Sequence, residues 1–286
     1  MFAEQAYAGN PLAVVIVDEP PDEATMQRVA AEINYSETTF VAPRPEADGG
    51  YRVRIFTPAR EIAFAGHPIL GTASVLRQHL GLPLQSPLRL NLMIGSVDVT
   101  FERAADAPEV AWFSAPAVAL GATCGRDAMA AALGLLPDDI DTGAPVQQAA
   151  AGTAAMIVPL RSLEALRRSQ LDLAAYAPLL AQGFPPLVYL FCRQTHDPRN
   201  DLCARFFFEA HGVREDPATG NGAAFLGAYL LAHRLLSDGD GSLRIEQGHF
   251  VRRPSLVLLR ARRTDDGCDI RVGGAVIQTV RGELVS

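Results

Sequence analysis

The sequence predicts an α+β fold of two similar lobes, each a curved, mostly antiparallel sheet wrapped around a central apolar helix. Three observations support this prediction. The chain has 286 residues, enough for about two domains of roughly 150 residues each. Both halves contain the same order of a strand, a glycine-containing polar loop, a buried helix and a pair of strands. Many strands with one central helix per half favour sheets that enclose their helices.

Each half contains one helix that is apolar on nearly all sides, which is typical of a buried helix. These helices are predicted at residues 68–80 and 221–236. Around them the sequence predicts, in order, a strand at 12–17, a helix at 22–34, strands at 51–57, 88–92 and 97–101 with a turn at Gly95-Ser96, a strand at 205–209, a turn-rich connection at 215–220, and strands at 243–246 and 256–261.

The lobe boundaries follow from this order of elements. The N-terminal lobe is predicted to contain residues 1–117 and 268–286, and the C-terminal lobe residues 118–267. Strands within 269–283 are expected to return to the first lobe, because a sheet edge there would otherwise lack a partner.

The charged residues exclude several classes of protein. The 25 basic residues are all arginine, against 32 acidic residues, which gives a net charge of −7. A mildly acidic chain without a basic cluster is a poor candidate for nucleic-acid binding. Because there is no lysine, the chain cannot use a pyridoxal phosphate Schiff base, a lysine aldolase mechanism or a P-loop.

The cysteines and the apolar segments indicate a cytoplasmic protein. Four scattered cysteines, none in a metal-ligand spacing, suit a reducing compartment. The longest strictly apolar run, residues 222–232, is far shorter than the ~20 residues that a membrane span needs. No nucleotide, flavin or metal motif is present, so we expect no cofactor, no metal site, no nucleic-acid partner and no membrane contact.

The strongest chemical signal is a glycine-bearing polar loop at the start of each buried helix, at Gly66 and at Gly220. A helix N-terminus offers unpaired N–H groups and a partial positive charge, and glycine lets a ligand approach the backbone closely. Two such ends that face one cleft would form a lysine-free site for a carboxylate. The alternative is that both are ordinary helix starts in compact turns.

Three side chains are candidates for chemistry. Glu37 precedes an apolar strand, where partial withdrawal from water would let it exchange protons with carbon acids near neutrality. His67 lies beside Gly66, and Asp216 precedes Pro217 near the second loop. The alternatives are an exposed glutamate, a structural histidine and a turn-forming aspartate.

Four segments carry a family resemblance, in order along most of the chain: Gly-Asn-Pro-Leu-Ala-Val-Val at 9–15, Asn-Tyr-Ser-Glu-Thr-Thr-Phe at 34–40, Phe-Ala-Gly-His-Pro-Ile-Leu-Gly-Thr-Ala at 64–73 and Glu-Asp-Pro-Ala-Thr-Gly-Asn at 215–221. The sequence resembles the PhzF-like phenazine biosynthesis family. The resemblance implies the diaminopimelate-epimerase-like fold, an active site in the cleft between the lobes, and cofactor-free isomerisation by proton transfer.

The resemblance also implies roles for individual residues. Glu37 matches the acid/base glutamate, and His67 and Asp216 match the histidine and aspartate that hold the substrate. Asn221 stands where the phenazine enzyme is expected to have a serine, which leaves the substrate open. Ala65 and Thr219 occupy the helix starts where two-cysteine epimerases of this fold carry thiols, so the thiolate-pair mechanism is not expected.

The leading hypothesis is therefore a cofactor-independent isomerase of a small carboxylate. Glu37 is its expected catalytic residue, and the expected substrate-binding residues are Gly66, His67, Asp216, Gly220 and Asn221. The expected assembly is a homodimer. Two alternatives remain, a non-catalytic carboxylate-binding protein on the same fold and an acid/base dehydratase or lyase.

Overall fold

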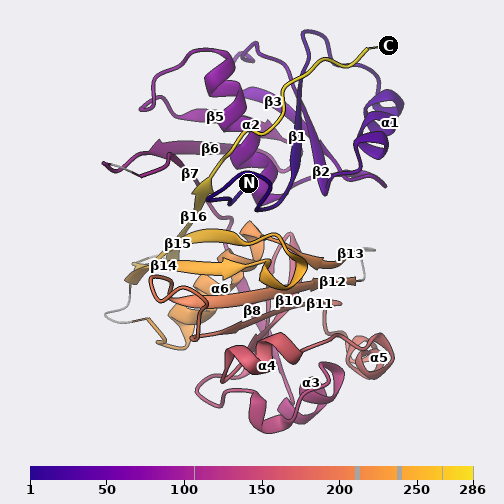
Figure 1. Ribbon diagram of the computed structural model, residues 1–286, viewed down its shortest axis with the longest axis vertical. Coiled ribbons are helices and arrows are strands. Elements are labelled where there is room, and N and C mark those ends of the chain that lie inside the picture. Colours follow the sequence, from indigo (N-terminus) through magenta and orange to yellow (C-terminus); the bar gives the residue numbers. More distant parts are fainter. Residues whose placement is uncertain (106, 210–212, 237–239, 266, 286) are drawn as a thin grey trace. The chain divides into compact units, whose positions relative to one another are not determined.

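A computed structural model describes residues 1–105, 107–209, 213–236, 240–265 and 267–285. Its contacts divide the chain into two compact units, Met1–Ser114 with Gly273–Ser286 (unit 1) and Ala115–Val272 (unit 2), drawn in Figure 1. Each unit is described by itself.

Unit 1 is a sheet with the strand order β1-β2-β3-β5-β6-β7, in which the short strand β4 pairs with β3. Its elements are β1 (Leu12–Ile16), α1 (Glu23–Ile33), β2 (Glu37–Val41), β3 (Tyr51–Phe56), β4 (Glu61–Ile62), α2 (Gly66–His79), β5 (Leu88–Leu92), β6 (Gly95–Glu102) and β7 (Val110–Ser114). Helix α2 is buried along nearly its whole length and contacts β1, β2, β5, β6 and β7.

Unit 2 is a sheet with the strand order β16-β15-β14-β12-β11-β10-β9-β8, in which the short strand β13 pairs with β12. Its elements are β8 (Ala119–Cys124), α3 (Arg126–Ala132), β9 (Val146–Ala151), β10 (Thr153–Pro159), α4 (Leu163–Arg168), α5 (Leu173–Ala181), β11 (Leu187–Cys192), β12 (Leu202–Phe208), β13 (Val213–Asp216), α6 (Gly220–Ala232), β14 (Asp240–Gln247), β15 (Ser255–Thr264) and β16 (Gly267–Ala275), with short 3₁₀ turns at Pro137–Asp139 and His249–Val251.

The two units repeat one pairing pattern. In unit 1, β1 pairs parallel with β2, β2 antiparallel with β3, β3 parallel with β5 and β5 antiparallel with β6. In unit 2, β10 pairs parallel with β11, β11 antiparallel with β12, β12 parallel with β14 and β14 antiparallel with β15. A short strand and then a buried helix follow β3 and β12 alike, so the predicted fold class is confirmed.

Local chemistry explains where helix α1 begins and ends. The Asp22 side chain accepts a hydrogen bond from the Thr25 backbone N–H at 2.7 Å, which caps the first turn. At the other end Asn34 adopts a left-handed conformation with φ of 54°, which asparagine tolerates better than most residues. The predicted range of 22–34 is thus the helix together with its two caps.

Several predicted boundaries are corrected by the structure. Gly95 and Ser96 are paired with Leu92 and Asn91 inside the hairpin, so its turn lies at Met93 and Ile94. Helix α2 begins at Gly66, two residues before Pro68, because proline is tolerated anywhere in a first helical turn whose N–H groups lack intrahelical partners. Helix α6 ends at Ala232 rather than at 236.

The connection predicted over 215–220 is partly a strand. Glu215 and Asp216 pair with Phe207 and Phe206 across β13 and β12. Turn-forming residues therefore begin only at Pro217, which has no N–H to offer a ladder.

The first part of unit 2 holds elements that the sequence pattern does not reveal. Helices α3, α4 and α5 have 7, 6 and 9 residues and cover a large apolar cluster built around Met129, Leu166 and Tyr176. Among the described residues, no helix combines the length and apolarity that crossing a membrane would require.

Candidate active site

Glu37 and His67 meet in unit 1, although 30 positions separate them in the sequence. Glu37 is the first residue of β2, and His67 lies in the first turn of α2. Two positions along the strand, the Thr39 hydroxyl lies 2.7 Å from the hydroxyl of Thr72 on α2. Because alternate residues of a strand share a face, Glu37 lies on the face of β2 that packs against α2.

The contact between the two side chains is close and withdrawn from solvent. Glu37 Oε2 lies 2.8 Å from His67 Nε2, and the side chains are 15% and 6% exposed. Both atoms are buried, and their approach lacks the alignment of a hydrogen bond. The carboxylate and the imidazole are therefore adjacent, but no well-aligned hydrogen bond joins them.

Asn10 contacts the other side of the imidazole. Its side-chain amide lies 3.3 Å from His67 Nδ1, and the asparagine is fully buried. This contact holds the ring with Nε2 toward Glu37. Asn10 belongs to the Gly-Asn-Pro segment noted above, but its contact with a histidine 57 positions away is visible only in the fold.

The start of α2 has no side-chain cap. Its N-cap residue, Ala65, makes no side-chain capping bond. Gly66 and His67 are both buried, at the helix end where the N–H groups and the positive end of the dipole lie.

The second group of predicted residues, Asp216, Gly220 and Asn221, meets in unit 2. Asp216 ends β13, and Gly220 and Asn221 open α6. The Thr219 hydroxyl donates to Asp216 Oδ2 across this junction. Asp216 and Asn221 are half-buried and Gly220 is buried.

Sequence reasoning missed Gln247, which holds this junction together. The side chain is fully buried and donates to the Asp216 carbonyl at 2.9 Å and to Thr219 Oγ1 at 3.1 Å. Its Oε1 accepts from the Thr219 backbone N–H at 3.3 Å. Gln247 lies at the end of β14, 31 positions from Asp216, and nothing in the local pattern marks it.

Replacing Gln247 by leucine should destabilise unit 2 by about 1–3 kcal/mol, because it removes three hydrogen bonds to buried polar groups of Asp216 and Thr219. The measurement is the midpoint of urea unfolding by circular dichroism. Gln182→Leu is the matched control, since its side chain is exposed and makes one hydrogen bond, to Pro178. Equal midpoint shifts in the two variants would contradict the anchoring role.

Tyr189 was also missed by the sequence analysis. It is fully buried on β11, and its ring lies against Gly222 in the first turn of α6. Burial, with smaller contributions from Cys203 and Asp216, raises the pKa of its hydroxyl, which stays protonated. Within the described part of the chain the hydroxyl has no hydrogen-bond partner.

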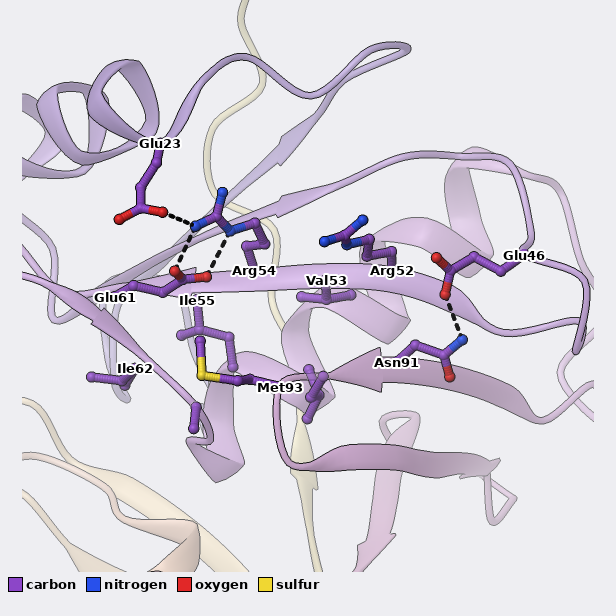
Figure 2. Close-up of a pocket in the computed structure, with 12 residues that line it drawn as sticks. Glu23, Glu46, Arg52, Val53, Arg54, Ile55, Glu61, Ile62, Asn91 and Met93 are labelled. Carbon is purple, nitrogen blue, oxygen red and sulfur yellow. Dashed lines mark hydrogen bonds and ion pairs between the residues drawn. The ribbon is translucent and has the colours of Figure 1, made fainter.

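A cavity of about 560 Å³ lies elsewhere in unit 1, beside β3 (Figure 2). Its charges are largely paired: Arg54 binds Glu61 at 2.5 Å and Glu23 at 2.8 Å, and Asn91 donates to Glu46 at 2.7 Å. Neither Glu37 nor His67 lines it. Paired, partly exposed ions suit a solvated surface better than proton transfer, so we place the candidate active site at Glu37 and His67.

Comparison with known proteins shows the family of the chain. The model of the phenazine biosynthesis-like protein family matches residues 1–282, so the chain belongs to that family. It is 33% identical to an uncharacterized isomerase of Mesorhizobium japonicum over 99% of this chain and 96% of that protein. It is 36% identical to the trans-2,3-dihydro-3-hydroxyanthranilate isomerase of Pseudomonas aeruginosa, over 91% of this chain and 87% of that enzyme. The chain is thus an isomerase of this family.

Solved structures match the fold. A phenazine biosynthesis protein of the PhzF family from Bacillus anthracis superposes with a TM-score of 0.87 at 24% identity, over 96% of this chain and 93% of that one. A predicted epimerase from Pseudomonas aeruginosa gives 0.81 at 32% identity, over 100% and 96%. A probable proline racemase from Agrobacterium radiobacter shares the fold alone, with 0.58 at 12% identity over 89% and 79%.

Proposed function

We propose that this isomerase moves a proton between two carbon atoms of a small carboxylate-bearing substrate, with Glu37 as general acid and base and without a cofactor. The observation that carries the proposal is the buried contact of 2.8 Å between Glu37 Oε2 and His67 Nε2. A buried carboxylate held beside an imidazole, with no hydrogen bond aligned between them, can exchange a proton with a bound molecule.

The proposed reaction runs in two proton steps. The Glu37 carboxylate removes a proton from a carbon atom, and the electron pair of that C–H bond moves into the neighbouring unsaturated system. The protonated Glu37 then returns the proton to a different carbon atom, so a double bond shifts and no atom is gained or lost. His67 binds the substrate beside Glu37, with its ring held by the contact to Asn10.

The N–H groups at the start of α2 support binding of the substrate carboxylate, since the helix dipole favours an anion there. We propose Gly66, His67, Asp216, Gly220 and Asn221 as substrate-binding residues. General acid/base catalysis typically contributes 10²–10⁴-fold to the rate, and preorganised donors supply much of the remainder. That one active site draws on both groups of residues stays a prediction.

The relative from Pseudomonas aeruginosa supports an amino- and hydroxy-substituted cyclic carboxylate as the substrate class. Asn221, in place of the expected serine, supports a difference in the substituent that is recognised. Trans-2,3-dihydro-3-hydroxyanthranilate is therefore the first compound to test, together with a panel of related amino- and hydroxy-carboxylates.

The decisive experiment incubates the protein with these compounds in D₂O and follows them by proton NMR and mass spectrometry. We expect an isomer that has the elemental formula of the substrate, with deuterium in place of a carbon-bound hydrogen. Saturable binding without any exchange or turnover would favour a binding protein instead. A product lighter by one water would favour a dehydratase.

A further inference from the structure

Three metal-ligand side chains meet in unit 2, outside the proposed active-site residues. His196, Glu246 and His249 each place one ligand atom within 4.8 Å of the others. Glu246 Oε2 is the common neighbour, 3.0 Å from His196 Nδ1 and 3.7 Å from His249 Nε2. A thiol lies beside them, with Cys203 Sγ 3.8 Å from His196 Nδ1.

These separations suit one tetrahedral ion. Zinc binds nitrogen, oxygen and sulfur ligands at about 2.0–2.3 Å, which places neighbouring ligand atoms roughly 3.3–3.6 Å apart. The separations of Glu246 Oε2 from the two histidine nitrogens, 3.0 and 3.7 Å, lie on either side of that range. Cys203 lies outside the group of ligand atoms that are all within 4.8 Å of one another.

Glu246 is held in position by its surroundings. Its side chain is 3% exposed, and Oε1 accepts from the Asp197 backbone N–H at 2.8 Å and from Asn200 Nδ2 at 2.7 Å. The His196 backbone N–H donates to Oε2 at 2.8 Å. Such outer hydrogen bonds orient the ligands of metal sites.

The two imidazole rings also define what must change when an ion binds. They stack with centroids 4.0 Å apart and planes 11° from parallel. A ligated imidazole holds its ion near the plane of the ring, and two parallel planes share no point, so one ring must turn. His196 has the room, because its side chain is 37% exposed.

From these contacts we propose that His196, Glu246 and His249 bind one divalent ion of the zinc class, with water in the fourth position. Binding leaves the ligating ring nitrogens unprotonated. The ion would join the 193–200 segment to β14 and to the turn at His249–Val251. Since Gln247 follows Glu246 directly, the bound ion would also stiffen the end of β14, from which Gln247 anchors Asp216. The proposal does not depend on the isomerase mechanism.

The test uses full-length protein without a histidine tag, stripped of metal and kept reduced. Titration with ZnCl₂ in a calorimeter should show saturable binding of one ion per chain. His196→Ala and His249→Ala should each weaken it at least about tenfold, and Asn200→Ala, which releases Glu246, by a similar factor. His79→Ala, an exposed histidine in unit 1, is the matched control and should bind like the unmodified chain.

Cobalt tests the ligand set. The Co²⁺-loaded protein should show no thiolate-to-cobalt absorption band, in Cys203→Ser as in the unmodified chain. Absence of stoichiometric zinc binding, or equal affinity in the histidine variants and the His79→Ala control, would overturn the site. A thiolate-to-cobalt band that disappears in Cys203→Ser and persists in Cys268→Ser, at an exposed cysteine, would overturn the proposed ligand set.

Discussion

Glu37→Gln should lower the rate of proton transfer by about 10²–10⁴-fold, the contribution typical of a positioned acid/base group. Glutamine keeps the shape of the side chain, so the fold and substrate binding should change little. What disappears is the basic carboxylate oxygen that accepts the proton.

The measurement is the initial rate on whichever compound exchanges deuterium, with circular dichroism and substrate affinity as checks on folding and binding. Glu32→Gln is the matched control, because Glu32 is exposed on α1. If Glu37→Gln retained a rate within about tenfold of the unmodified chain, equivalent to ~1.4 kcal/mol of barrier, Glu37 would not be the acid/base.

Arg205→Met should destabilise unit 2 by about 3–5 kcal/mol, because it leaves a buried carboxylate without its cation. Arg205 Nη2 lies 2.7 Å from Glu215 Oε2, and the two side chains are 9% and 2% exposed. The guanidinium also donates to the carbonyls of Leu166 and Ser169, at 2.9 and 2.7 Å. Removing the cation therefore leaves one buried charge and two carbonyl groups without this donor.

Two probes separate this effect from global unfolding. Trp112, the single tryptophan, lies in unit 1 and reports on that unit by fluorescence, whereas circular dichroism reports on the whole chain. The exposed pair Arg167–Glu164 supplies the control Arg167→Met, expected to cost less than about 1 kcal/mol. The double variant Arg205→Met with Glu215→Leu should recover part of the loss. Similar midpoint shifts for Arg205→Met and Arg167→Met would contradict the prediction.

The central helices were predictable from sequence because their signal is local. An apolar helix that starts at a glycine-bearing loop can only be buried, and both α2 and α6 are. Strands β9 and β10 were not predictable: their alanine-rich segments carry little strand preference, and cross-strand pairing between them overrides it. Strand β13 was hidden for a related reason, since Asp216-Pro217 is typical of a turn.

For the candidate site, the sequence predicted which residues take part but not the contacts between them. Glu37 and His67 could be chosen because each stands at the start of an element, yet their distance of 2.8 Å depends on how β2 packs against α2. Gln247 and the cluster around Glu246 could not be chosen, because long-range sheet pairing brings these residues to their partners. The histidines show the same limit: the sequence spacing gave no metal-ligand motif, whereas the fold brings His196 and His249 to Glu246.

Unit 1 is built from two segments that the ribosome synthesises at different times, Met1–Ser114 and Gly273–Ser286. The Phe2 ring lies against Gly274, and the Ala3 N–H donates to the Ala275 carbonyl at 3.3 Å. A ribosome must therefore synthesise all of unit 2 before unit 1 can acquire these contacts. Domains usually fold in the order of their synthesis, but here the unit begun first is completed last. Until then the apolar surface around Phe2 and Trp112 stays uncovered on the nascent chain, a window in which chaperones can engage it.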